Sequence, residues 1–167
     1  MKQIDPKQLR FVIYLRKSSD SEDKQVASIP QQKKELTELA AREGLHIVAT
    51  LIETHSAYRP GRPKFQEMLE MIEGGKVDAV LAWSASRISR NSLDGGAFLY
   101  KFENKKLKAF KTIGRTIYGS SDDSFTLDID LGIAKKSSAD LSEAVLRGNR
   151  YKFYEKKEWV GLLNQDT

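Results

Sequence analysis

Residues 11–20 read FVIYLRKSSD, and this stretch decides the fold. Its apolar first half predicts a strand over about residues 10–17, which ends in an arginine and two hydroxyl side chains. Because a strand points successive side chains to opposite faces, Tyr14, Arg16 and Ser18 are expected to share one face. These polar groups would lie towards the carboxyl end of the strand, where open α/β sheets bind their ligands.

Helical and strand patterns alternate along the rest of the chain. A helix is expected to begin at Ser28 as its N-cap, with Pro30 in its first turn and Gln31 completing a capping box, and to end at Gly44. A second helix is expected to begin with Pro63. The other expected elements are strands over about residues 45–52, 77–83 and 107–113 and a helix over about residues 92–105.

This alternation predicts an α/β fold, with a mainly parallel central sheet of four to five strands flanked by helices. A length of 167 residues suits one domain with a sizeable core. With 40% hydrophobic and 31% charged residues the chain has the composition of a globular protein. Its apolar runs are too short to cross a bilayer, and we expect a cytoplasmic location.

Residues 124–134 fit two patterns. Alternate residues from Phe125 to Ile133 are apolar, as in a strand, whereas Leu127, Leu131 and Ala134 form a stripe at helical spacing. The local pattern leaves both structures open. Beyond Val145 the chain becomes basic and aromatic.

Composition also bounds the chemistry. The chain has no cysteine, which excludes disulfides, thiolate nucleophiles and zinc sites built on cysteine, and its two histidines cannot form a histidine-rich metal site. A net charge of +5 weakly favours a polyanionic partner.

Polar side chains follow three of the predicted strands. The strand ends supply Arg16 and Ser18, then Glu53, Ser56 and Arg62, then Arg87 and Arg90. Several arginines around a hydroxyl do not suit ester hydrolysis, which needs a histidine base beside the serine. They suit a phosphoryl centre, because a guanidinium group binds two phosphate oxygens at once through two parallel N–H groups. Taken singly, a pair of serines after a strand most often forms an ordinary turn, and the last two arginines could belong to a solvated helix face.

The combined pattern resembles the serine recombinases, in three ordered blocks over about residues 10–157. The blocks are Tyr14-x-Arg16-x-Ser18 with Gln25, Ser28-Ile29 and Gln32; Arg62-Pro63 with Phe65; and Trp83-x-x-x-Arg87-x-x-Arg90-Asn91. The Ser-Ile-x-x-Gln and Arg-Pro forms look most like the large serine integrases.

The resemblance implies a resolvase-like fold that cleaves double-stranded DNA by direct attack of the Ser18 hydroxyl on a phosphodiester, leaving a 5′-phosphoserine linkage. It implies no metal and no nucleotide cofactor. The matching positions make Arg16, Arg62, Arg87 and Arg90 phosphate-binding residues. The matching supporting positions are Tyr14, Gln25, Gln32 and Glu53.

The resemblance also implies a domain order and partners. Residues 1–125 would form the catalytic domain, residues 126–158 a long helix for oligomerisation and DNA approach, and residues 159–167 a tail. We expect a homodimer that becomes a tetramer on DNA, with the stripe Leu127, Leu131 and Ala134 facing the partner subunit. The residues expected near DNA are Arg147, Arg150 and Lys152. DNA-recognition domains would be absent, as in a piece of a longer recombinase.

Three positions depart from the family pattern. Ser86 stands where an acid is common, Glu53 where an aspartate is usual, and Ser137-Ser138 where a Glu-Arg pair is frequent. These departures keep open a catalytically impaired DNA-binding or oligomerisation module of the same fold. The sheet pattern alone is also compatible with a flavodoxin-like protein that binds a small ligand.

Overall fold

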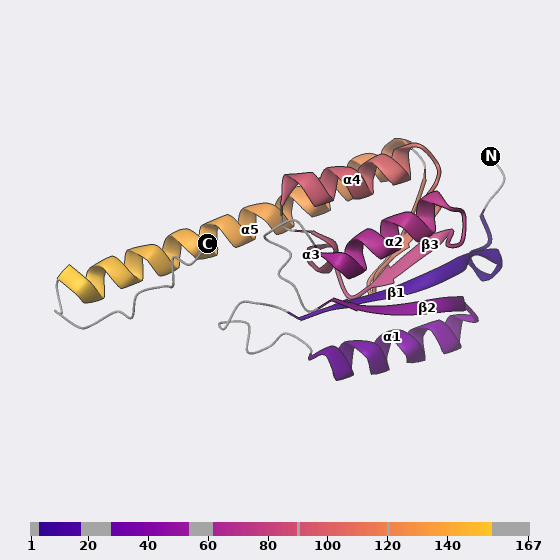
Figure 1. Ribbon diagram of the computed structural model, residues 1–167, viewed down its shortest axis with the longest axis horizontal. Coiled ribbons are helices and arrows are strands. Elements are labelled where there is room, and N and C mark those ends of the chain that lie inside the picture. The colour runs from indigo at the N-terminus through magenta and orange to yellow at the C-terminus, as the bar shows by residue number, and fades with distance from the viewer. Residues whose placement is uncertain (1–3, 18–27, 54–61, 90, 120, 155–167) are drawn as a thin grey trace. The chain divides into compact units, whose positions relative to one another are not determined.

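A computed structural model describes residues 4–17, 28–53, 62–89, 91–119 and 121–154. Five strands form one sheet in the order β2-β1-β3-β4-β5, and only the last pair is antiparallel. This confirms the predicted α/β fold with a mainly parallel sheet (Figure 1). The strands are β1 (Arg10–Arg16), β2 (His46–Glu53), β3 (Ala79–Ala82), β4 (Ala109–Lys111) and β5 (Thr116–Tyr118). The helices are the 3₁₀ turn η1 (Pro6–Gln8), α1 (Ile29–Glu43), α2 (Pro63–Glu73), α3 (Ala85–Ile88), α4 (Ser92–Glu103) and α5 (Ser121–Tyr154).

Strand β1 lies inside the sheet, and both of its faces are covered by helices. Phe11, Ile13 and Leu15 pack in one apolar cluster with residues of α1, whereas Val12 and Tyr14 pack in the other with residues of α2 and α4. Helix α1 accordingly lies on one side of the sheet, with α2 and α4 on the other (Figure 1). This two-sided burial explains the continuous apolar run, which is typical of a parallel strand.

Helix α1 begins and ends where the sequence predicts, with one difference at its start. Ser28 Oγ accepts a hydrogen bond from the backbone N–H of Gln31 at 3.3 Å, and Pro30 lies in the first turn. The side chain of Gln31 does not complete the capping box, because its Nε2 donates to Glu35 Oε1 at 3.0 Å. Gly44 ends the helix in the left-handed conformation, with φ of 68°.

The ambiguous residues 124–134 are helical and belong to α5. The expectation that Leu127, Leu131 and Ala134 face a partner subunit is wrong. These three side chains are buried, and the two leucines belong to the core cluster that includes Phe98 of α4. The stripe completes the domain's own apolar core on the α2 and α4 side of the sheet. Phe125, on another face of the same helix, is 68% exposed.

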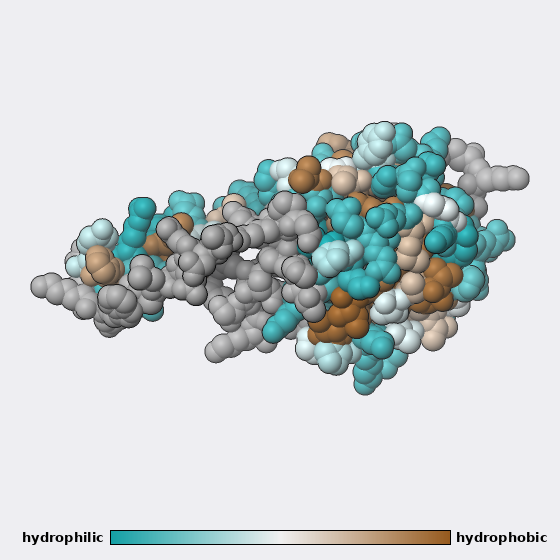
Figure 2. Space-filling view, in the orientation of Figure 1, coloured by the Kyte–Doolittle hydropathy of each residue, from teal (hydrophilic) through white to brown (hydrophobic). Residues whose placement is uncertain are grey.

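The chain divides into two compact units, residues 1–135 and 136–167. The described part of the second unit is the remainder of α5, where Arg147 Nη1 donates to Glu143 Oε1 at 3.1 Å. Among the described residues, no helix combines the length and the apolar character needed to cross a membrane. The described surface in view is mostly hydrophilic, with separate apolar patches (Figure 2).

Candidate active site

The candidate site lies at the carboxyl ends of the parallel strands. From β1 the chain crosses to β2 on one side and later to β3 on the other, so a topological switch point falls between β1 and β3. Arg16 is the last residue of β1, Glu53 is the last of β2, and Arg87 lies in the short helix that follows β3. The structure therefore brings the ends of three strands together at a position where α/β sheets bind ligands.

Four of the residues singled out from sequence, Ser18, Gln25, Ser56 and Arg90, lie outside the described residues. The DNA-contact candidates Arg147, Arg150 and Lys152 are described and exposed on α5, in the second unit.

Arg16 is completely buried and donates to three backbone carbonyl oxygens. Its Nη1 donates to Lys17 at 2.7 Å, its Nη2 to Ser86 at 3.0 Å, and its Nε to Arg87 at 3.2 Å. The carbonyl of Arg16 itself accepts a hydrogen bond from Gln32 Nε2 at 3.2 Å. These bonds tie the end of β1 to α3 on one side and to α1 on the other.

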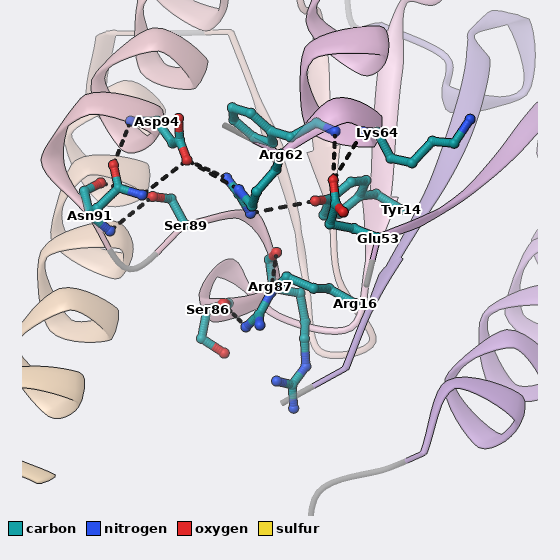
Figure 3. Close-up of polar contacts among 11 residues, drawn as sticks. Tyr14, Arg16, Glu53, Arg62, Lys64, Ser86, Arg87, Ser89, Asn91 and Asp94 are labelled. Atoms are coloured by element: carbon teal, nitrogen blue, oxygen red, sulfur yellow. Dashed lines mark hydrogen bonds and ion pairs between the residues drawn. The ribbon is translucent and has the colours of Figure 1, made fainter. Parts of the chain in front are cut away.

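Arg62 is also buried, as the N-cap residue of α2. Its Nε donates to Asp94 Oδ2 at 3.1 Å, and its Nη2 forms an ion pair with the same oxygen at 2.9 Å. Its Nη1 donates to the Tyr14 hydroxyl at 3.4 Å, and the guanidinium carbon lies 4.0 Å from the centre of the Phe65 ring. Figure 3 shows Arg62 between Asp94 and Tyr14, with Arg16 and Arg87 in a second group of contacts.

Glu53 caps the helix that carries Arg62. Its Oε2 accepts hydrogen bonds from the backbone N–H groups of Lys64 at 3.0 Å and Phe65 at 3.3 Å, in the first turn of α2. Arg62 makes no side-chain cap bond, so the Glu53 carboxylate supplies the acceptor that this helix start needs. Its negative charge also suits the positive end of the helix dipole. The last residue of β2 thus fixes the position from which Arg62 projects.

Tyr14 is neutral in this arrangement. Burial raises the pKa of Tyr14 well above its usual value, and the opposing effect of the Arg62 charge is smaller. The phenol therefore keeps its proton at neutral pH and acts as a hydrogen-bonding group, not as a base.

Sequence reasoning missed Asp94 as a partner of Arg62. Asp94 lies three residues after Asn91, the N-cap of α4. The backbone N–H of Asp94 donates to Asn91 Oδ1, and Asn91 Nδ2 donates to Asp94 Oδ2, both at 2.9 Å. The Asn-x-x-Asp spacing at a predicted helix start is a capping signal that could have drawn attention to it. Among the described residues, no group of three or more acidic, histidine or cysteine side chains could hold a metal ion.

Comparisons with known proteins identify the family and the fold. A protein-family model described as "Resolvase, N terminal domain" matches residues 11–157. The C-terminal catalytic domain of ISC1926 TnpA, an IS607-like serine recombinase, is 26% identical, with 63% of this chain and 69% of that chain covered and a TM-score of 0.52. The N-terminal catalytic domain of TP901-1 integrase is 25% identical, with coverage of 79% and 98% and a TM-score of 0.56. A resolvase family site-specific recombinase from Streptococcus pneumoniae, 21% identical, shares the fold with coverage of 89% and 100% and a TM-score of 0.56.

Proposed function

Because this chain belongs to the serine recombinase family, we propose that it is the catalytic part of a site-specific DNA recombinase in which Ser18 is the nucleophile. The observation that carries the proposal is the position of Ser18 in the chain, two residues after Arg16 and directly beyond the strand end that Arg16 ties to α3. A strand that ends at a topological switch point delivers the next side chains to the ligand-binding edge of the sheet.

The proposed step exchanges one phosphoester bond for another. Ser18 Oγ forms a bond to the DNA phosphorus as the bond from phosphorus to the 3′ oxygen breaks. The serine proton leaves to a base, and the departing 3′ oxygen takes up a proton to become a hydroxyl. A 5′-phosphoserine ester remains, and attack by an exchanged 3′ hydroxyl reverses the step. Since one phosphodiester replaces another, the reaction requires no nucleotide energy source.

The proposal assigns different tasks to the residues at the strand ends. Arg62, Arg87 and Arg90 would bind the phosphate oxygens, and Arg16 would contribute charge while it holds the end of β1. A buried guanidinium stabilises phosphate charge more strongly than an exposed one, because water screens it less. The supporting residues would be Tyr14, Gln25, Gln32 and Glu53.

We propose that the long helix, residues 126–158, mediates oligomerisation and approaches the DNA. Residues 1–125 would form the catalytic domain and residues 159–167 a tail. The buried stripe of α5 leaves Phe125, Ile129 and Ile133 as exposed apolar residues at four-residue spacing on one face. We propose this face, and not the buried stripe, as the homodimer surface, with a tetramer on DNA. Arg147, Arg150 and Lys152 would contact DNA phosphates.

The proposed nucleophile can be tested with the full chain fused to a sequence-specific DNA-binding domain. The fusion is mixed with a target that carries a nick, which traps the cleaved strand, and covalent protein–DNA adduct is measured on a denaturing gel. We expect adduct from the wild type and from Ser19→Ala, the matched control, and none from a folded Ser18→Ala variant. Undiminished adduct from Ser18→Ala would overturn the assignment. Binding and pairing of sites without any adduct would instead indicate a catalytically impaired module.

A further inference from the structure

We infer that Asp94 is a positioning residue for the reaction, which acts by fixing the orientation of the Arg62 guanidinium. The inference rests on the proposed function of Arg62 as a phosphate-binding residue. Asp94 contacts Arg62 through one oxygen, Oδ2, which meets Nε at 3.1 Å and Nη2 at 2.9 Å. Both side chains are almost inaccessible to solvent, with 0% of the arginine and 4% of the aspartate side chain exposed.

Asp94 is itself held in place before any DNA arrives. It lies in the first turn of α4, where its backbone N–H donates to Asn91 Oδ1 and its Oδ2 accepts from Asn91 Nδ2, both at 2.9 Å. The start of a helix also favours a negative charge. The carboxylate is therefore a rigid anchor and not a flexible surface acid.

The described contacts leave some N–H donors of Arg62 without an acceptor. Asp94 occupies the edge of the guanidinium formed by Nε and Nη2, while Phe65 covers one face at 4.0 Å. Among the described contacts, Nη2 makes an ion pair but no hydrogen bond of good geometry, and the bond from Nη1 to Tyr14 is long, at 3.4 Å. Since the two terminal nitrogens carry four N–H groups, Asp94 and Tyr14 do not use all of them, and we assign the remaining donors, which are buried in the absence of DNA, to phosphate oxygens.

The position of Asp94 explains why its carboxylate would assist the interaction of Arg62 with a phosphate, although both anions attract the same cation. Asp94 neutralises Arg62 in the absence of DNA, as a buried cation requires. It also fixes the plane of the guanidinium, so that its donors are already oriented towards the phosphate when the reaction begins.

The test measures single-turnover adduct formation by the fusion protein at saturating DNA, for the wild type, Asp94→Asn, Arg62→Lys and the double variant. We expect Asp94→Asn to lower the rate at least tenfold with unchanged DNA affinity. It should lower the rate by less than twofold in the Arg62→Lys background, because a lysine has no plane to orient. Asp78→Asn removes a different ion-paired carboxylate, and as the matched control it should leave the rate of folded protein unchanged.

A wild-type rate for folded Asp94→Asn, or an equal loss in both backgrounds, would overturn the inference. Failure of the proposed function is a separate result, namely no adduct from the wild type. Nitrogen-15 spectra of the full chain then still decide the geometry. The Arg62 Nε–H resonance, assigned through its loss in Arg62→Lys, should exchange with solvent at least tenfold faster in Asp94→Asn, and unchanged exchange would refute the positioning contact.

Discussion

Replacing Arg16 by methionine tests whether this buried arginine holds the fold together as well as carrying charge. The variant removes the donors of three carbonyl oxygens, those of Lys17, Ser86 and Arg87. The bond to Arg87 is buried, and a buried acceptor without a partner costs about 2 kcal/mol. The other two bonds are only partly buried, so water can replace them at about 0.5 kcal/mol each. The expected loss in the free energy of unfolding is about 3 kcal/mol.

Urea unfolding followed by circular dichroism measures this loss. With a slope of about 2 kcal/mol per molar urea, the midpoint of Arg16→Met should fall by about 1.5 M. Arg42→Met, which removes an exposed arginine of α1, is the matched control and should change stability by less than about 0.5 kcal/mol. A midpoint within about 0.3 M of the wild type would refute the reasoning that the Arg16 hydrogen bonds stabilise the fold by holding β1 to α3. If the loss is seen, activity measurements on Arg16 variants need a correction for the unfolded fraction.

Three further predictions concern other parts of the described structure. Arg10 and Lys108 hold the pKa of Asp78 below its usual range, so its carboxylate stabilises the fold fully above the unfolded pKa of about 4. This stabilisation is lost as the pH falls below that value, so the difference in urea midpoint between wild type and Asp78→Asn should shrink from pH 7 to pH 3. Glu53→Gln keeps an acceptor at the start of α2 but removes its charge, and unfolding experiments should show a loss of about 1 kcal/mol. Leu127→Ala should cost about 3 kcal/mol through a core cavity, whereas Phe125→Ala should leave unfolding of the monomer unchanged and weaken self-association in sedimentation velocity.

Local signals made the core of the fold predictable. The run before Arg16 is apolar at every position because β1 is covered on both faces, and Ser28 and Gly44 mark the ends of α1 through backbone chemistry that involves only neighbouring residues. Where the outcome depended on residues far apart in sequence, local patterns were insufficient. The strand order and the three-residue strand β5 arise from pairing across the sheet. Residues 124–134 are helical because Leu127 and Leu131 pack on the core, a contact that no local pattern contains.

The candidate site, like the fold, was only partly predictable from local sequence patterns. The polar residues at three strand ends were visible in the sequence because parallel strands end at one edge, but their partners were not. Nothing in the sequence near Arg62 indicates that Asp94 pairs with it, since the two residues lie 32 positions apart. Likewise the three carbonyl oxygens that receive Arg16 come from a backbone conformation and not from a residue type. Predicting such pairs requires the strand order first.

The burial of the arginines is itself an argument about function. Charged side chains are almost never fully buried unless they are paired, because removing a charge from water is costly, and apolar residues of similar size commonly stabilise a core as well. Arg16, Arg62 and Arg87 are each less than 5% exposed at one edge of the sheet. A site that must stabilise phosphate charge benefits from this burial, since low polarity strengthens the attraction. The same burial requires acceptors while the site is empty of DNA, and Asp94 meets that requirement for Arg62 from one edge of the guanidinium. In the proposed role of Arg62, a phosphate and the Asp94 carboxylate would bind different donors of one guanidinium, so the ion pair would not have to break when DNA binds.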